Sequence, residues 1–477
     1  MNKKLITLAV AAALAAPAAA MAEATLYGKL NVSIDYANVK NAVAPVYETG
    51  TGYAYDANGN MVVNADGDPI MVRNAYVLDS NGNVITQQGG QDFNGWGVNG
   101  QGSYMPGESR ANRVGVKGSE DLGNGLKAIY QVEFGVYFGA RDDNIPSGNN
   151  GGVDMRNSFV GLAGDWGTFL VGRHDTPLKI STGKLDLFVD TMADYNGTVG
   201  FDDLRVDNTA AYISPSFGGL SFAGAVVAPG GATAGYGANI NSDSLAGAYS
   251  LALIYSNGPF YASAAYESLS NEMFNNTDTS LGGASACLYQ ENGFDAYGIP
   301  VAAGTGIPNC NYVNDDYNKW RFGLGLLDWN GFTLTAIYEN QDQLPLGQQR
   351  QAANFIDQDG NIVALGTAPL GTDEQQLWQV QAGYAFGNSM FKAMYGAVDR
   401  GDVRAFGATR ETLSLNNLSK DLAGDRSTWA VGFDHNFSKR TQAYILYTNV
   451  DDDGNGTRNL GYDEGWDGFS LGMKHSF

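Results

Sequence analysis

Aspartates are concentrated in one long stretch of this sequence, between two strand-like segments. The stretch runs from Arg173 to Arg205, and its acids are Asp175, Asp186, Asp190, Asp194, Asp202 and Asp203. Basic residues stand at both ends, and opposed charges of this kind act on ions and dipolar solutes. A loop this long in a β protein is uncommon unless it is functional. We interpret it as a loop folded into the lumen of a β-barrel; the alternative is a solvated surface loop.

The sequence has no arrangement typical of an enzyme or a metal centre. Its histidines are His174, His435 and His475, and no nucleophile–base spacing or metal-ligand cluster accompanies them. We therefore predict neither an enzyme nor a cofactor. Nucleic acid is not an expected partner, because binding it needs patches of lysine and arginine, whereas the net charge is −22.

The start of the chain is typical of a secretory signal peptide. Lys3 and Lys4 precede an apolar run from Leu5 to Ala20, and a small-x-small cleavage pattern follows before Glu23. The run is alanine-rich and short for a membrane-spanning helix. We expect residues 1–22 to be a signal peptide and residues 23–477 to form the mature domain.

Two cysteines, Cys287 and Cys310, are the only ones in the sequence. An even number of cysteines in an exported chain indicates a disulfide. We predict one disulfide between them, which would close a local loop.

Strands with one apolar and one polar face recur along the chain. In 24–36 and again in 126–138, apolar residues fall mainly on alternate positions, which is the period of a β-strand. We count sixteen such strands, joined alternately by short turns and long loops. This alternation, with an exported chain rich in glycine and tyrosine, favours an all-β fold, a transmembrane antiparallel β-barrel. A secreted β-sandwich or β-solenoid is the competing class.

Residues 38–108 form a long polar insertion, which we predict to be the first extracellular loop. Segments 56–60, 64–68 and 79–83 carry Asn-Gly or Asp-Gly pairs beside short apolar runs, a pattern typical of hairpin turns. Their oxygen-bearing side chains also suit calcium. No segment has the twelfth-position glutamate of an EF-hand, so we favour hairpins.

The last strand alternates up to a C-terminal phenylalanine. Phe469, Leu471, Met473, His475 and Phe477 share one face. An apolar edge strand at a terminus is an aggregation hazard unless another strand pairs with it. Pairing with the first strand would close a barrel and leave no unpaired backbone in lipid.

Several short motifs together resemble general porins of the Gram-negative outer membrane. They are LYGK at 26–29, RVGVKG at 113–118 with EDLG at 120–123, RNSFVGL at 156–162, VGR at 171–173, DNT at 207–209 and GMKHSF at 472–477. The resemblance covers essentially the mature chain. It implies a sixteen-stranded barrel, a homotrimer, an inward-folded third loop at 174–204, and recognition of Phe477 by the barrel assembly machinery.

The resemblance also implies a pore constriction made of opposed charges. The basic positions of the family's wall match Lys29, Arg113, Arg156 and Arg205, and the third loop would present Asp186, Asp190 and Asp194 opposite them. Arg173 is a further candidate, with a subunit contact as the alternative. A barrel of this strand number leaves an aqueous channel. We expect passive diffusion of small hydrophilic solutes and ions, with a weak cation preference from the acidic balance.

Two other functions stay open at this point. A substrate-specific channel would need a ladder of aromatic or basic residues along the lumen, and a surface adhesin or receptor would use a motif such as Arg400-Gly401-Asp402 in an outer loop. The acidic outer loops could also bridge divalent cations on lipopolysaccharide, since carboxylates suit magnesium and calcium. Outer-membrane lipid and lipopolysaccharide are therefore expected partners.

Overall fold

The computed structural model describes most of the chain, with gaps between segments. The described residues are 23–43, 46–53, 71–77, 79–80, 85–99, 110–136, 153–228, 245–270, 289–290, 294–295, 316–342, 355–356, 362–364, 370–372, 374–400, 403–405, 425–452 and 465–477. The expected signal peptide, Cys287 and Cys310 lie outside them.

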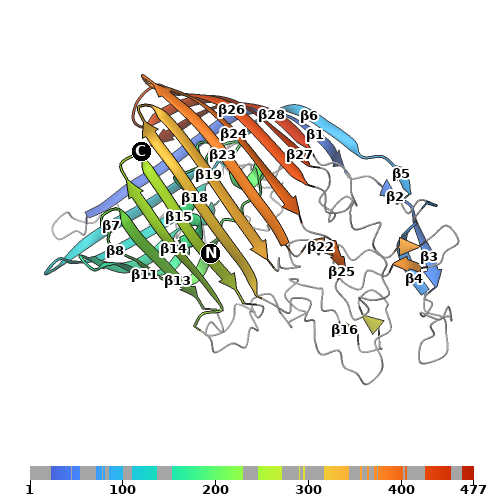
Figure 1. Ribbon diagram of the computed structural model, residues 1–477, viewed down its shortest axis with the longest axis horizontal. Coiled ribbons are helices and arrows are strands. Elements are labelled where there is room, and N and C mark those ends of the chain that lie inside the picture. Colours follow the sequence, from blue (N-terminus) through green and yellow to red (C-terminus); the bar gives the residue numbers. More distant parts are fainter. Residues whose placement is uncertain are drawn as a thin grey trace, which may run out of the picture.

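Sixteen antiparallel strands close into a barrel (Figure 1), as the sequence predicted. In ring order they are β1 (Glu23–Val43), β7 (Arg113–Gly123), β8 (Leu126–Val136), β10 (Ser158–Gly164), β11 (Gly167–Asp175), β12 (Arg205–Ile213), β13 (Leu220–Val227), β14 (Ala248–Asn257), β15 (Phe260–Leu269), β18 (Tyr317–Trp329), β19 (Phe332–Asp342), β23 (Glu374–Phe386), β24 (Ser389–Arg400), β26 (Arg426–Asn436), β27 (Thr441–Asp452) and β28 (Trp466–Ser476). The ring closes where β1 pairs with β28, from Lys29 opposite Ser476 to Val39 opposite Trp466. We call this pairing the seam.

Two further strands belong to the same sheet without adding a place to the ring. The first is β6 (Gln91–Asn99), which pairs with the outer part of β1, while β7 pairs with its first residues. The second is β9 (Val153–Met155), which extends β8. The strand β1 is thus longer than the predicted 24–36, because β6 supplies a partner for residues Ser33–Val43 inside the expected 38–108 loop.

Short strand pairs lie between the barrel strands. They are β2 (Val46–Tyr47) with β5 (Thr86–Gln88), β3 (Thr49–Tyr53) with β4 (Met71–Val77), β16 (Tyr289–Gln290) with β17 (Phe294–Asp295), β20 (Phe355–Ile356) with β21 (Ile362–Ala364), and β22 (Leu370–Thr372) with β25 (Val403–Ala405). The antiparallel β3–β4 pair occupies part of the insertion for which hairpins were predicted.

The barrel is apolar outside and polar inside, the reverse of a soluble protein. Along β19, Phe332 and Leu334 are 55% and 57% exposed, whereas Thr333 and Thr335 between them are 7% and 2% exposed. Alternation of this kind lets lipid cover the outer face and water reach the inner one. Tight turns join the strands at one end; Asn124 and Gly125 between β7 and β8 both have positive φ, as a two-residue hairpin turn requires.

The third loop lies inside the barrel. Because β11 extends to Asp175, its irregular part is 176–204, and it contains two short helices, α2 (Pro177–Thr182) and α3 (Tyr195–Thr198). Neither these nor any other described helix is long and apolar enough to cross a membrane.

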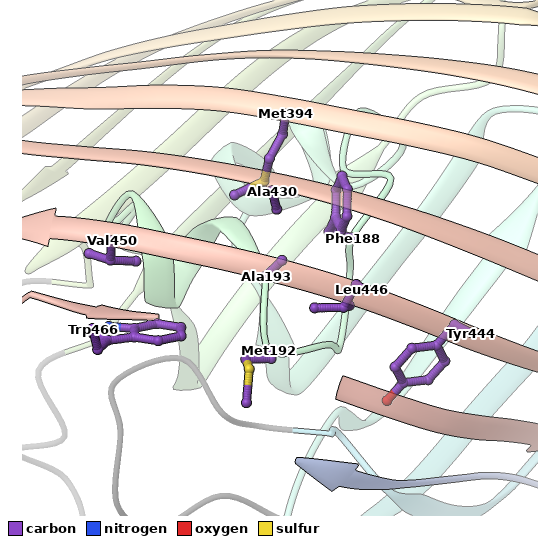
Figure 2. Close-up of a cluster of buried hydrophobic side chains, with 9 residues drawn as sticks. All are labelled: Phe188, Met192, Ala193, Met394, Ala430, Tyr444, Leu446, Val450 and Trp466. Carbon is purple, nitrogen blue, oxygen red and sulfur yellow. The ribbon is translucent and has the colours of Figure 1, made fainter. Parts of the chain in front are cut away.

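Apolar side chains of the third loop form a core with the inner wall. Phe188 and Met192 pack against Met394, Leu446 and other residues of β24, β26, β27 and β28 (Figure 2). The wall makes room for them with glycines: a Cβ on Gly432 would lie 3.1 Å from the Phe188 ring, and one on Gly468 would lie 2.5 Å from the Met192 sulfur. Such burial of apolar surface fixes the loop against this side of the barrel.

Candidate pore constriction

The third loop follows the inner wall for more than half of the ring. Tyr261 on β15 donates to the Ser181 carbonyl at 2.8 Å, and Thr335 on β19 donates to the Leu185 carbonyl at 2.8 Å. Further on, the side-chain oxygen of Gln381 on β23 accepts from the Leu187 backbone N–H at 2.6 Å. Each contact satisfies a backbone group that would otherwise be buried without a partner.

Side chains near the seam hold the tip of the third loop by its carbonyl oxygens. Lys392 on β24 donates to the Leu187 carbonyl at 2.7 Å, and Lys474 on β28 donates to the Val189 carbonyl at 2.8 Å. Asn31 on β1 donates to the Asp190 carbonyl at 2.6 Å. The loop therefore spans from β11 to β1, and it leaves open only the side of the lumen bounded by β1, β7, β8 and β10 to β12.

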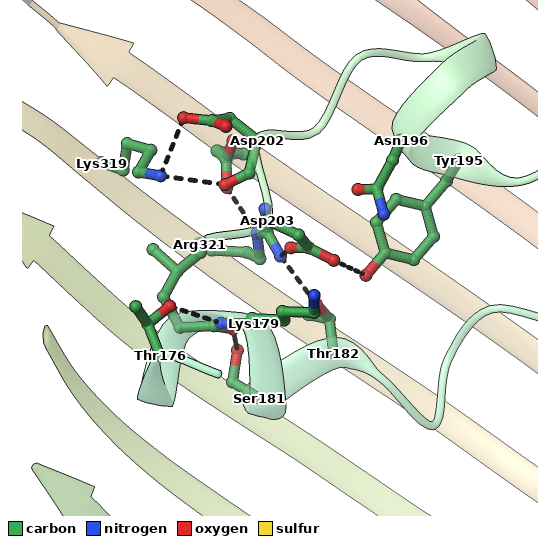
Figure 3. Close-up of polar contacts among 12 residues, drawn as sticks. Thr176, Lys179, Ser181, Thr182, Tyr195, Asn196, Asp202, Asp203, Lys319 and Arg321 are labelled. Carbon is green, nitrogen blue, oxygen red and sulfur yellow. Dashed lines mark hydrogen bonds and ion pairs between the residues drawn. The ribbon is translucent and has the colours of Figure 1, made fainter. Parts of the chain in front are cut away.

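Buried ion pairs fix the returning part of the third loop (Figure 3). Lys319 on β18 lies 3.2 Å from the Asp202 carboxylate and 2.7 Å from that of Glu267. Its neighbour on the same face, Arg321, pairs with Asp203 of the loop at 2.5 Å and with Glu339 of β19. The side chains of Lys319 and Arg321 are both fully buried. Charges buried to this degree need paired partners.

The three expected acids of the third loop lie in different surroundings. Asp190 forms an ion pair with Lys29 of β1. Asp186 is buried and accepts from Gln381 at 2.9 Å and from the Phe188 backbone N–H at 2.8 Å. Asp194 is also buried and caps α3, accepting from the Asn196 backbone N–H at 2.9 Å and from the Asp190 N–H at 2.8 Å. Their role in the constriction stays a prediction.

Burial disfavours the charged forms of two of these acids. It raises the pKa of Asp186 to about 7, and the charge of Asp194 adds to the effect. Burial also raises the pKa of Asp194 to about 6. The backbone N–H groups that both carboxylates accept from oppose these rises and limit them.

The predicted basic residues gather on the open side of the lumen in two pairs of contacts. Arg113 and Arg156 share Glu133 of β8, with nitrogen–oxygen distances of 3.8 and 2.7 Å. The Tyr27 hydroxyl donates to the same carboxylate at 2.9 Å. We call Arg113, Arg156 and Arg205 the arginine wall.

The third member of the arginine wall has an acid of its own. Arg205 lies 2.9 Å from the Asp175 carboxylate, which also receives Lys179 of α2 at 3.1 Å, and Arg205 donates to the Asn157 side chain at 2.7 Å. Across these contacts four basic side chains meet two carboxylates, those of Glu133 and Asp175. The open side of the lumen therefore carries a local excess of positive charge.

Arg173 does not join the arginine wall. It pairs with Asp207 at 2.8 Å, and that aspartate's side chain is 68% exposed. Its Nε donates to the Met155 carbonyl at 3.1 Å.

The C-terminal Phe477 lies at the seam. Its backbone N–H and carbonyl form two hydrogen bonds with Gly28 of β1, at 3.1 and 3.0 Å. A Cβ on Gly28 would lie 2.3 Å from the Phe477 ring, so a glycine is required where the ring covers β1. The structure places Arg400 on β24, but Gly401 and Asp402 lie outside the described residues.

Sequence reasoning did not assign the residues that hold the third loop. They are Asn31, Lys319, Arg321, Gln381, Lys392 and Lys474. The available signal was their place on the inward, polar positions of apolar strands, where long charged side chains have no reason to be unless something inside the barrel meets them. Among the described residues, no group of three or more histidine, cysteine or acidic side chains could hold a metal ion.

Comparison with known proteins gives a consistent result. The sequence model of the Gram-negative porin family matches residues 7–455. The chain is 31% identical over 223 residues to the major outer membrane protein P.IB of Neisseria meningitidis, covering 46% of this chain and 48% of that protein. It is 29% identical over 275 residues to the P.IB of Neisseria lactamica, covering 56% and 58%. The chain thus spans about half the length of the curated relatives it matches.

Solved structures share the fold. An anion-selective porin from Comamonas acidovorans superposes with a TM-score of 0.51 and 18% identity, covering 96% of this chain and 100% of that one. Salmonella typhi OmpF, solved in complex with daunomycin, gives a TM-score of 0.50 and 14% identity, covering 96% and 98%.

Proposed function

Because this chain belongs to the Gram-negative porin family and lies in the outer membrane, we propose that it is a passive diffusion channel for small hydrophilic solutes and ions. One observation carries the proposal. The third loop crosses the interior from β11 to β1 and is held there along its length, so that the remaining passage runs between this loop and the arginine wall. A passage with charged walls admits polar solutes and disfavours apolar ones.

We propose that Lys29, Arg113, Arg156 and Arg205 form one side of the constriction, and that Asp186, Asp190 and Asp194 shape the other. Asp190 contributes through its pair with Lys29. Asp186 and Asp194 contribute by holding the fold of the third loop, since their carboxylates accept from loop backbone groups. Arg173 is proposed to serve a contact outside the passage, as its pairing with Asp207 supports.

The ion preference that we propose is weakly cationic. The net charge of −22 attracts cations toward the channel mouths. The arginine wall opposes this locally, and it acts at short range, because charges farther away than about 10 Å are screened at 0.1 M salt. The opposition of the two effects is the reason to expect a weak preference.

A planar bilayer recording in a salt gradient tests both parts. Reconstituted protein should give conductance that rises linearly with salt and is insensitive to sugars, with a small reversal potential of the sign for cations. A clear anion preference would overturn the selectivity and keep the channel. Block by one solute class at low concentration would replace the general channel with a substrate-specific one, and an absence of conductance would overturn both.

We further propose a homotrimer that contacts outer-membrane lipid and lipopolysaccharide. Rows of exposed apolar residues such as Leu334 and Phe332 on the barrel support burial in lipid or against another copy. The signal peptide, the pairing of Cys287 with Cys310, and recognition of Phe477 by the barrel assembly machinery complete the proposal. Conductance steps in threes would support the trimer, and single steps at all protein concentrations would count against it.

A further inference from the structure

A small sheet outside the barrel joins two loops that start from distant strands. Its order is β21-β20-β4-β3. The strands β3 and β4 belong to the insertion between β1 and β6, whereas β20 and β21 belong to the connection between β19 and β23. The two halves meet through a parallel pairing in which Phe355 lies opposite Tyr76, and Ile356 opposite Val77.

The strands that this sheet connects are far apart on the ring. Counted through β28, β27, β26 and β24, the strand β23 is the fifth from β1, and β19 is the sixth. Five strands correspond to roughly 24 Å of wall at about 4.8 Å per strand. Figure 1 shows β3 and β4 beyond the end of the barrel where the long connections lie, outside its wall. The pairing therefore spans the rim and does not join neighbouring loops.

The sequence provides a second, independent reason for this pairing. Both paired strands lead into the same pattern of residues, LDSNGNVI at 78–85 and IDQDGNIV at 356–363. A related copy, YDANGNMV at 55–62, follows β3. Repeats of one hairpin unit bury their edges against one another, as stacked repeats do in larger repeat proteins.

We propose that β3, β4, β20 and β21 form a strap over the outer mouth, and that this strap is a second size filter ahead of the constriction. The strap restricts solutes by obstruction, so its effect grows with solute size and leaves small ions almost unaffected. This part rests on the proposed channel function. The joining of the two loops does not.

A cross-link tests the joining without any reference to transport. Cα partners across adjacent strands are close enough for a disulfide, so the Tyr76→Cys, Phe355→Cys double variant should oxidise to a single cross-linked species in folded protein. Mass spectrometry of the peptides separates this link from the native cysteines, and each single variant serves as the control. Failure to form the link in folded protein would overturn the strap, whether or not the protein conducts.

A proline tests the filter. β20 lies between β4 and β21 in the sheet, where proline removes a backbone donor and is not tolerated. Ile356→Pro should admit oligosaccharides severalfold faster in liposome swelling, with salt conductance near that of the wild type. The matched control is Arg404→Pro in β25, whose pairing with β22 joins neighbouring loops; this variant should keep the wild-type size limit.

Two results would overturn the filter while leaving the channel intact. One is an Ile356→Pro variant with the wild-type size limit, and the other is an equal gain in the Arg404→Pro control. Should Ile356→Pro not assemble, deletion of 354–365 removes β20 and β21 and leaves all barrel strands in place. That deletion should show the same gain for large solutes, and its absence would likewise overturn the proposal.

Discussion

At the scale of single residues, the constriction depends on shared carboxylates. Glu133 serves both Arg113 and Arg156, and Asp175 serves both Arg205 and Lys179. Each carboxylate neutralises one of its two partners, so one cation in each pair adds to the field in the lumen. The consequence is that the arginine wall acts on passing ions although every member has an acidic neighbour.

Replacing Arg156 by glutamine should strengthen the cation preference. A unit charge about 8 Å from an ion in water interacts by about 0.5 kcal/mol, which corresponds to roughly a twofold change in the ratio of cation to anion permeability. The reversal potential in a salt gradient measures this ratio. Arg173→Gln is the matched control, because Arg173 lies outside the arginine wall, and an equal shift in this control would contradict the assignment.

At the scale of elements, the strands were predictable and the packing of the third loop was not. Strands such as 126–138 follow from alternation, since each residue faces either lipid or the interior. The depth of Asp186 and Asp194 depends on Gln381, Phe188 and other residues that only the closed barrel brings near. No periodicity within 174–204 encodes such contacts, which explains why the three loop acids could not be told apart from sequence.

The third loop should be held less firmly as pH rises through 6 to 7. Asp186 and Asp194 have pKa values raised to about 7 and about 6, so the folded loop binds protons that the unfolded chain releases near pH 4. The stability that this contributes is complete below pH 4 and is lost as pH rises through the raised values.

Open-channel current noise measures this loosening, and it should be greater at pH 8 than at pH 5. Neighbouring charges that face the two acids are Lys392, Lys474 and Asp203. Asp186→Asn keeps the shape and removes one titrating group, so its noise should depend less on pH. Noise that falls with rising pH, or an unaltered dependence in this variant, would contradict the assignment.

Removing Arg321 should release the returning part of the third loop. Arg321→Met leaves Glu339 and Asp203 buried without their cation, and breaking a buried pair in this way costs about 3 kcal/mol. We expect a larger and noisier single-channel conductance. Arg440→Met, in an exposed turn between β26 and β27, is the control; if both variants conduct alike, the buried pairs do not fix the loop.

At the scale of the whole molecule, closure depends on the seam, where Phe477 makes its two backbone hydrogen bonds with Gly28. Deleting Phe477 should slow assembly, because it removes those bonds and the ring that covers β1. The fraction of heat-modifiable, folded barrel on a gel after a fixed time measures the rate. Phe437→Ala removes another exposed aromatic residue close to a short turn, and it should assemble at the wild-type rate; an equal delay would point to general aromatic anchoring.

The position of the loop tip has a consequence for the order in which the molecule forms. Val189 and Asp190 are held by Lys474, Asn31 and Lys29, which stand on the last and first strands of the chain. Contacts of such long sequence separation form late, after the entropy of closing large loops has been overcome. The narrow passage therefore cannot exist in a partly assembled barrel. A chain truncated before β28 would lack both its seam and its constriction, so the selective pore comes into being in the same step that completes the wall.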